Sequence, residues 1–293
     1  MKRMKLESNK FRKIVKRFVP GFLINLITSF FYGWRGNYSS WEKALQKSSG
    51  YDAKNILDKV KDATLKVKNG TYPYERDSVV FNKIQYSFPV LCGLMWIAAQ
   101  NKGRLNVLDF GGSLGSTYYQ NKKFLDSLNE VHWCIVEQHN FVQVGKEQFS
   151  DKCLRFYHSI DDCLNENNSD IVLFSGVLQY LENPYEMLDY VKSKKFDYVI
   201  IDRTAFISRP DRITIQKAHP AIYKASYPCW FFNESKFISY MNSDYELITD
   251  FDSLGSTNIK SEIKGFIFKR KEPNYFNSPE KFKFDVKSIK INS

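Results

Sequence analysis

The chain has 293 residues, of which 16% are aromatic, so it can bury a full core and does not have the composition of a disordered protein. Its net charge is +11, but residues 1–70 carry 16 Lys or Arg against 5 Asp or Glu, while the remaining residues carry 27 of each sign. The neutral main body argues against a nucleic-acid-binding protein. Five scattered cysteines without a C-x-x-C pair argue against a disulfide framework and against a zinc site.

The first 34 residues combine a basic segment with an uncharged apolar one. Residues 1–17 hold eight basic side chains and one acidic one, and residues 18–34 (FVPGFLINLITSFFYGW) hold no charge. A cleavage site for a secretory signal is missing, and a helix of this apolar length spans about 25 Å, less than a bilayer core of about 30 Å. Two interpretations stay open: an anchor on an anionic membrane surface, or a helix packed on the main domain.

Residues 35–103 are predicted to form a helical extension of the main domain. The sequence SSWE at 39–42 is typical of a capped helix start, and apolar spacing predicts a second helix over 53–68. Two further helices are expected over 78–87 and 90–99, on either side of Pro89. The last of these is apolar on nearly all sides, which indicates a buried helix.

Residues 105–137 have the pattern of a strand, a glycine-rich turn, a helix and a second strand. The run Leu105–Phe110 is closed by GGSLG at 111–115, whose glycines allow a sharp turn and the close approach of a ligand. The helix that follows directs free N–H groups at that ligand. Glu137 ends the second strand, where a carboxylate can accept both hydroxyls of a ribose. The stretch predicts a nucleotide-type cofactor site; an ordinary strand–turn–helix junction without a ligand is the simpler alternative.

The glycine spacing favours one cofactor over another. A dinucleotide fingerprint has glycines at relative positions 1, 3 and 6, whereas here they fall at 1, 2 and 5, with Asp109 two residues before the first. An acid followed by a glycine turn resembles motif I of class I S-adenosylmethionine (SAM)-dependent methyltransferases. Ser113 stands where that motif has its middle glycine.

Beyond Glu137 the alternation of strands and helices continues. Strands are expected at 154–157, 170–175 and 196–202, with helices at 139–149 and 184–191 between them. A segment rich in Tyr, Pro, Trp and His follows, and then a helix at 235–241 and two strands at 245–251 and 263–269 without a helix between them. The pattern predicts an α/β fold: a Rossmann-like doubly wound sheet, mostly parallel, with a C-terminal antiparallel hairpin. The expected parts are 1–34, the extension 35–103, a SAM-binding methyltransferase domain at 104–270 and a polar tail at 271–293.

Several segments resemble one family more specifically. A group of SAM-dependent methyltransferases associated with bacterial surface-polysaccharide gene clusters is similar to this chain over roughly residues 32–270. The segments that carry the resemblance are YGWRGNYSSWEKAL, SSGYDA, YERDSVVFNKIQYS, VLDFGGSLGSTYYQN, VEQ, LQYL, IIDRT and YPCWFF. The resemblance implies the class I methyltransferase fold, SAM as cofactor and methyl transfer as reaction, without naming an acceptor.

The resemblance also implies roles for the motif residues. Asp109 is expected to contact the methionine part of SAM through the turn, and Glu137 to hold the ribose diol. The other cofactor contacts are expected from Gly111, Gly112 and Ser113 in the turn, Gln138, Ser159 and Ile160 near the adenine, and Ser175 and Gly176 under the sulfonium. A plain helix cap before Asp161 is the alternative for Ser159. No metal site is expected.

The acceptor side is less defined by the sequence. Methyl transfer from a sulfonium needs in-line positioning, with a base if the acceptor is a hydroxyl. His219 lies in the aromatic segment after the fifth strand, where this class builds its acceptor pocket, and an imidazole can take a hydroxyl proton. Tyr223 is a second catalytic candidate, and Tyr227 and Trp230 are expected to line the pocket or to cover the core. A loop histidine before Pro220 is the alternative for His219.

The sequence therefore predicts a SAM-dependent methyltransferase that acts on a hydroxyl or other group of a glycan or glycolipid precursor in surface-polysaccharide biosynthesis. The expected location is the cytoplasm, with peripheral attachment to the inner face of the membrane through residues 1–34. Two alternatives are a catalytically idle methyltransferase-like assembly partner and a nicotinamide-dependent oxidoreductase. Nucleic-acid methylation is not expected, because Asn183-Pro184-Tyr185 matches an Asn-Pro-Pro-Tyr signature only in part and is typical of a helix start.

Overall fold

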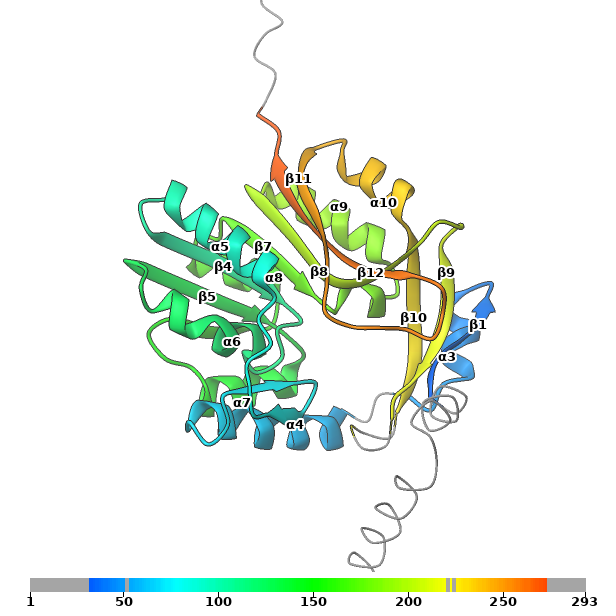
Figure 1. Cartoon of the computed structure of the whole chain (residues 1–293), viewed down its shortest axis with the longest axis horizontal. Helices are drawn as coiled ribbons and strands as arrows, with labels where there is room; N and C mark the ends of the chain where they lie inside the picture. The colour runs from blue at the N-terminus through cyan, green and yellow to red at the C-terminus, as the bar shows by residue number, and fades with distance from the viewer. Residues whose placement is uncertain (1–31, 51–52, 220–221, 223–224, 273–293) are drawn as a thin grey trace, which may run out of the picture.

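The computed structural model describes residues 32–50, 53–219, 222 and 225–272, and the apolar runs of the sequence form its central strands (Figure 1). Five strands lie parallel in the spatial order β6-β5-β4-β7-β8. Their bounds are β4 (Arg104–Phe110), β5 (Glu130–Val136), β6 (Leu154–Tyr157), β7 (Ile171–Ser175) and β8 (Tyr198–Ile207). Side chains of these strands are buried on both faces, as expected for parallel strands that helices cover on either side.

Two groups of helices cover the two faces of the sheet. Along β4, Val107 packs into one apolar cluster and Leu108 into the other, because successive side chains of a strand point to opposite faces. The first cluster includes α5 (Phe88–Gln100), α6 (Ser116–Leu125) and α7 (His139–Gln148). The second includes α8 (Ile160–Glu166), α9 (Pro184–Lys194) and α10 (Glu234–Met241). The three layers agree with a doubly wound α/β fold.

The last two strands close the sheet as an antiparallel pair. β12 (Glu262–Arg270) pairs antiparallel with β8, and β11 (Tyr245–Asp252) pairs with the outer edge of β12. The order along this part of the sheet is β11-β12-β8-β7-β4-β5-β6. The predicted fold class, a mostly parallel sheet with a C-terminal antiparallel hairpin, is confirmed.

The aromatic segment after β8 is more regular than the sequence predicted. β9 (Arg212–Lys217) and β10 (Ser226–Asn233) form an antiparallel hairpin, and the end of β10 pairs with Phe206 and Ile207 of β8. β1 (Gly33–Tyr38) pairs with β9, so both segments join the main sheet and extend away from the parallel strands, on the right of Figure 1. The strands escaped prediction because β9 has only two apolar residues, Ile213 and Ile215, and because a proline inside a run, here Pro228 in β10, argues against a strand.

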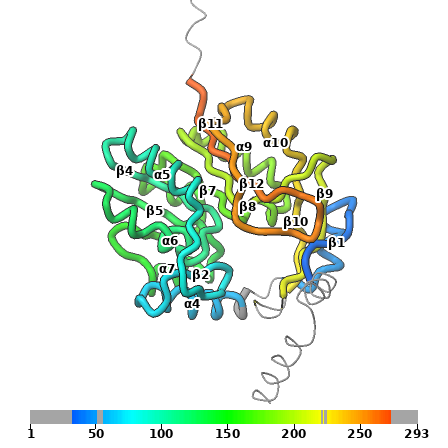
Figure 2. The backbone as a smooth tube through the Cα atoms, viewed as in Figure 1, coloured from blue at the N-terminus to red at the C-terminus, as the bar shows by residue number. Residues whose placement is uncertain are grey.

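The described part of the N-terminal extension contains three helices and a small hairpin, and α5 is the buried helix that was expected over 90–99. α3 (Trp41–Gln46) and α4 (Ala53–Lys68) form where helices were expected. The prediction of a helix over 78–87 is wrong. β2 (Tyr74–Arg76) and β3 (Val79–Phe81) form a two-stranded sheet there, which lies beside α4 in Figure 2. Asp77 and Ser78 connect them with φ values of 51° and 67°, the two-residue turn that suits a hairpin. The β-branched and aromatic residues of β3 favour a strand.

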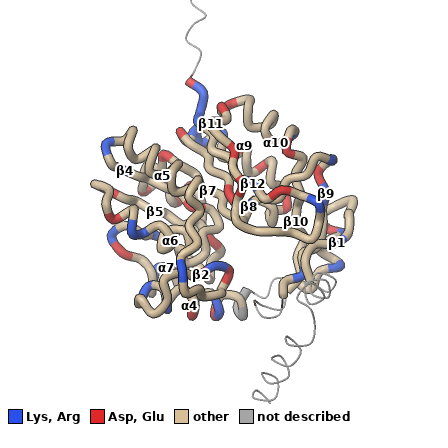
Figure 3. The backbone as a smooth tube through the Cα atoms, in the orientation of Figure 1, with Lys and Arg blue, Asp and Glu red and all other residues tan. Residues whose placement is uncertain are grey.

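The charged side chains agree with the neutral main body inferred from the sequence. Figure 3 shows Lys and Arg interspersed with Asp and Glu over the described elements. The basic segment 1–17, the apolar segment up to residue 31 and the tail from residue 273 lie outside the described residues. Within the described residues, the helices are all too short or too polar to cross a membrane.

Candidate functional site

The carboxyl ends of the parallel strands bring most of the predicted site residues together. Phe110 of β4 lies opposite Val136 of β5, so the glycine turn and Glu137 leave the sheet side by side. On the other side of β4, β7 ends at Ser175, opposite Asp202 of β8. The chain runs outward from β4 in one direction and from β7 in the other, so this edge contains the switch point where doubly wound sheets bind ligands.

The glycine turn after β4 is tight and is held to the neighbouring strands. The N–H of Gly111 donates to the carbonyl of Val136 at 2.9 Å, and Gly111 has a φ of 70°. A Cβ atom at this position would lie 2.4 Å from the side chain of Val177, so only glycine fits. Ser113, which replaces a glycine of the motif, adopts a φ of 57°. The serine therefore keeps the left-handed conformation, at a cost of about 1–2 kcal/mol.

Asp109 lies beneath this turn and is buried, with 1% of its surface exposed. The indole N–H of Trp133 donates to Asp109 Oδ2 at 3.1 Å, while Oδ1 has no partner among the described residues. Burial raises the pKa of Asp109 to about 7, the Trp133 bond opposes the rise, and the nearby Glu137 adds to it. A Cβ atom on Gly112 would lie 2.5 Å from this carboxyl group. Asp109 and Gly112 therefore fix each other, and the acid supports the turn from below.

Glu137 follows β5 and is half-buried beside the turn. Burial raises the pKa of its carboxyl group, and the backbone N–H groups of Gln138 and Ser113, which donate to it, oppose the rise. The Gln138 N–H lies 2.7 Å from Oε2. The carboxylate is thus held at the end of the strand by the backbone on both sides, where it can accept hydrogen bonds from a diol.

The residues predicted to contact adenine lie at the ends of the next strands. Gln138 is exposed and precedes α7. Ser159 caps α8, since its hydroxyl accepts from the Asp162 N–H at 3.0 Å, and Ile160 is buried against the second cluster. The cap role considered for Ser159 is present, and the adenine contacts of these three residues stay predictions.

Ser175 belongs to a small hydrogen-bonded group at the end of β7 and the middle of β8. Its hydroxyl donates to Asp202 Oδ2 at 2.8 Å, and the hydroxyl of Ser253 donates to Asp202 Oδ1 at 2.8 Å. Gly176 follows with a φ of 71°, and its N–H donates to the Asp202 carbonyl. Asp202, 3% exposed, thereby fixes the end of β7 to the middle of β8. The sequence pattern alone did not identify Asp202 or Ser253 as site residues.

Arg203 follows Asp202 and was also missed. It has a φ of 51°, which is rare for a side chain of this size. Its Nη2 donates to the Ser175 carbonyl at 3.3 Å, and its Nη1 lies 3.6 Å from Asp77 Oδ2. The signal in the sequence is IIDRT, where polar residues interrupt a buried apolar run; in the structure β8 continues through them to Ile207.

Glu75 is a second buried acid near this edge, 2% exposed. The hydroxyl of Ser116, the first residue of α6, donates to its Oε1, and Oε2 has no partner among the described residues. Burial raises the pKa of Glu75 to about 7, although the Ser116 bond lowers it. No strand was expected at β2, so its sequence gave no reason to place an acid against α6.

A small pocket opens between the β2–β3 hairpin, α6, the end of β7 and the middle of β8. Its lining is polar and consists of Tyr74, Arg76, Ser87, Ser116, Thr117, Gln120, Ser175, Asp202, Arg203 and Leu254. It therefore joins the predicted Ser175 to residues from the N-terminal extension.

The predicted acceptor residues lie along the β9–β10 hairpin. His219 follows β9, and its ring meets that of Tyr32 edge to face at 4.8 Å. Seven residues of β10 separate this end of the hairpin from the junction with β8, about 24 Å along a strand. Tyr223 lies outside the described residues. The proposed roles of both stay predictions.

The aromatic residues of β10 pack on the loop that follows Ser175 and Gly176. Tyr227 meets Tyr180 edge to face at 5.3 Å, and the Trp230 indole N–H donates to the Leu181 carbonyl at 3.0 Å. Trp230 also stacks on Trp41 at 6.2 Å. The hairpin thus forms an aromatic wall beside the switch point.

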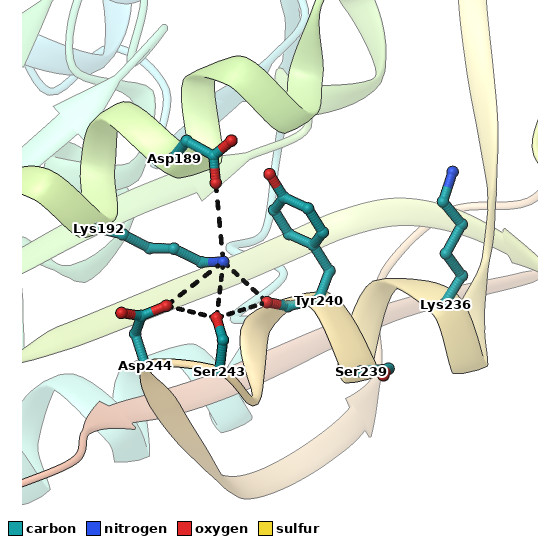
Figure 4. A pocket seen from close by; sticks show the side chains of 7 residues that line it. All are labelled: Asp189, Lys192, Lys236, Ser239, Tyr240, Ser243 and Asp244. Carbon is teal, nitrogen blue, oxygen red and sulfur yellow. Dashed lines mark hydrogen bonds and ion pairs between the residues drawn. The ribbon is translucent and has the colours of Figure 1, made fainter.

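A second, open depression lies between α9 and α10 (Figure 4). Lys192 occupies it and donates to the Tyr240 carbonyl at 2.8 Å and to the Ser243 hydroxyl at 3.1 Å. Asp189 and Asp244 lie 3.8 and 3.6 Å from the same ammonium group. Because α9 ends just before the start of β8, this depression is near the amino ends of the strands. Lys192 joins the two helices, and the cofactor site is at the opposite edge.

Comparisons with known proteins concern the fold. No protein-family model and no curated protein sequence matches the chain. The N-terminal domain of EvdMO1, solved with SAH and D-fucose, is 11% identical with a TM-score of 0.45, over 76% of this chain and 98% of that one. Magnesium protoporphyrin IX methyltransferase (ChlM) from Synechocystis PCC 6803, with SAH, is 12% identical with a TM-score of 0.44, over 75% and 100% of the two chains. The 1,6-didemethyltoxoflavin-N1-methyltransferase of Burkholderia thailandensis is 11% identical with a TM-score of 0.40, over 76% and 92%. At these levels of similarity, the chemistry has to come from this chain's own residues.

Proposed function

We propose that this protein is a SAM-dependent methyltransferase. The observation that carries the proposal is the alignment of Glu137 with the glycine turn at adjacent strand ends, with Asp109 buried beneath the turn. Nucleotide-type ligands bind at such an edge, and glycines at 1, 2 and 5 disfavour a dinucleotide. The strand order with an antiparallel β12 beside β8 supports the class I methyltransferase fold.

The residues present fit the cofactor. The turn has no room for a Cβ atom at Gly111 or Gly112, and one oxygen of Asp109 has no partner among the described residues. Glu137 would accept the ribose hydroxyls, and the turn and the start of α6 would present backbone N–H groups to the methionine part. When bound, SAM supplies a methyl group on a sulfonium. Ser175 and Gly176 would then border the reacting end, and the protein's task is mainly to align the acceptor with it.

The departure at Ser113 does not favour the idle assembly partner. Ser113 holds the positive φ that the motif requires, and its backbone N–H donates to Glu137. The turn is therefore formed despite the substitution.

For the acceptor we propose a hydroxyl or other group of a glycan or glycolipid precursor of a surface polysaccharide. The family resemblance supports this class. Of the two aromatic residues of β10, Tyr227 is the one proposed to stack on a sugar ring, because Trp230 already stacks on both Trp41 and Phe232. His219 is the proposed base, and Tyr223 the second candidate. An attachment to an anionic membrane surface was expected from residues 1–34, because a basic segment precedes an apolar one. Gly33 and Trp34 belong to β1, so the proposed attachment is limited to the residues before this strand.

Titration of S-adenosylhomocysteine into Glu137 variants tests the cofactor assignment. Loss of a charge-assisted bond to the ribose costs about 1.5–3 kcal/mol, so Glu137→Ala should weaken binding about tenfold to a hundredfold. Glu147→Gln, an exposed glutamate on the neighbouring α7, is the matched control and should bind like wild type. Unchanged affinity in Glu137→Ala would remove the ribose assignment.

A further inference from the structure

The guanidinium of Arg203 has more donors than well-placed acceptors. An arginine side chain carries five N–H donors, and charge-assisted bonds to a carboxylate are normally about 2.7–2.9 Å long. The two contacts of Arg203 are longer, 3.3 Å to the Ser175 carbonyl and 3.6 Å to Asp77 Oδ2. Asp77 is itself 58% exposed at the tip of the β2–β3 hairpin. The guanidinium is thus held loosely, by an acid that can move away.

The backbone is unusual at Arg203 and at the neighbouring Gly176. Gly176 has a φ of 71°, which favours glycine, and a Cβ atom there would lie 2.9 Å from Arg203 Nη2. Arg203 itself takes a φ of 51°. Such strained conformations cost of order 1–3 kcal/mol and cluster at functional sites.

The pocket beside Arg203 offers donors to an anion. Arg76 and the Thr117 hydroxyl line it together with Arg203, while the Ser116 hydroxyl, also in the lining, already donates to Glu75. The one acid in the lining, Asp202, has both oxygens bonded by Ser175 and Ser253. A ligand oxygen entering this pocket therefore meets two guanidinium groups and the Thr117 hydroxyl, beside a single carboxylate whose oxygens are already bonded.

The position of Arg203 points to the acceptor. The cofactor proposed above extends from Glu137 after β5, across Gly111 after β4, to Ser175 at the end of β7, and Arg203 lies one strand farther, within β8 just beyond the level where β7 ends. A guanidinium beside a sulfonium is unfavourable, because like charges repel in a partly buried site. An anionic group between the two charges would remove that repulsion.

We propose that the methyl acceptor carries an anionic group, a carboxylate or a phosphate, which Arg203 binds in exchange for its contact with Asp77. The inference rests on the proposed methyltransferase function and adds the charge of its substrate. The Asp77 carboxylate serves as an internal stand-in, and a ligand carboxylate or phosphate can bind the planar guanidinium through two parallel hydrogen bonds.

The experiment uses the full-length protein saturated with S-adenosylhomocysteine. Methyl β-D-glucuronide and methyl β-D-glucoside serve as probes that differ in the carboxylate, and glucose 6-phosphate as the phosphate probe, each titrated by saturation-transfer NMR. We expect one of the anionic probes to bind at least tenfold more tightly than the glucoside. Arg203→Gln should reduce this ratio to about one, and Arg203→Lys should keep part of it. Arg209→Gln, at an exposed position of the turn after β8, should leave it unchanged.

Asp77→Asn should raise the affinity for the anionic probe, and a misfolded variant would not show such an increase. Removing the competing carboxylate should tighten the anionic probe severalfold while leaving the glucoside unchanged. Asparagine also tolerates the φ of 51° at this position, so the hairpin turn is preserved.

Two results would overturn the inference. One is equal binding of charged and neutral probes to the wild type. The other is a loss of S-adenosylhomocysteine affinity in Arg203→Gln with unchanged affinity for 5′-methylthioadenosine, which lacks the amino-acid part; this would assign Arg203 to the cofactor's own carboxylate. Failure of the wild type to bind S-adenosylhomocysteine at all would instead refute the methyltransferase function.

Discussion

Replacing Asp109 by asparagine should change how the stability of the protein depends on pH. The unfolded chain releases the Asp109 proton near a pKa of about 3.9 and the folded protein near about 7. The folded state therefore binds more protons between these values, so the free energy of unfolding falls as the pH rises from about 4 to 7 and is constant above. Asparagine has no proton to release and keeps an oxygen that accepts from Trp133, so this dependence disappears in the variant.

The size of the effect follows from the two pKa values of Asp109. Relative to a neutral side chain, ionisation lowers the free energy of unfolding by about 1.5 kcal/mol at pH 5 and by about 4 kcal/mol at pH 7.5. The stability of Asp109→Asn relative to wild type should thus improve by about 2.5 kcal/mol between these pH values. Asp58→Asn, at an exposed position of α4, controls for the loss of a charge.

Urea unfolding of the ligand-free proteins at pH 5 and pH 7.5 measures this difference. Because each variant is compared with wild type at the same pH, the contribution of the other buried acid, Glu75, to the pH dependence of stability cancels in the difference. A variant-minus-wild-type difference that stays constant within 0.5 kcal/mol would refute the burial of an ionisable Asp109 beneath the turn.

Three further predictions concern the turn, the helices and the N-terminal segment. Gly112→Ala should lower the free energy of unfolding by about 1–3 kcal/mol and weaken S-adenosylhomocysteine binding, because the new Cβ atom would lie 2.5 Å from the Asp109 carboxyl group. Calorimetry that gives the variant the same stability and affinity as wild type would contradict this prediction. Lys192→Met should lower the free energy of unfolding, measured in urea, by about 1–2 kcal/mol, because the hydrogen bonds to Tyr240 and Ser243 are lost. Cofactor affinity should stay unchanged. A weakened affinity would contradict a cofactor site at the opposite edge of the sheet. The intact protein should sediment with anionic vesicles in a salt-sensitive manner, and deletion of residues 1–31, which spares β1, should abolish this; binding that survives the deletion would reject the anchor.

The central strands could be predicted because their signals are local. The apolar runs around Val107, Leu173 and Ile200 are each bounded by turns, and burial on both faces leaves little choice of structure. The hairpin at β2–β3 and the β9–β10 pair could not be predicted in this way. β2 and β3 have only three residues each, and β10 contains Pro228. These strands gain stability from partners: β3 from β2, and β9 from both β10 and β1.

The parts of the candidate site that follow directly after a single strand could be predicted from the sequence. Glu137 and the glycine turn follow directly from the pattern of a strand and its turn. The Asp202 carboxylate accepts a hydrogen bond from Ser253, which is 51 residues away in sequence, and Arg203 contacts Asp77 at the tip of the β2–β3 hairpin. Those pairs arise from the tertiary fold, so the sequence indicates the polar residues without indicating their partners.

Calorimetric titration of the intact protein with SAM, S-adenosylhomocysteine and NAD tests the central claim most directly. The arrangement of Glu137, the glycine turn and Asp109 predicts one site that binds SAM and S-adenosylhomocysteine, with no heat from NAD at the same concentrations. Binding of NAD without either adenosyl compound, or no binding of any of the three, would contradict a SAM-dependent methyltransferase.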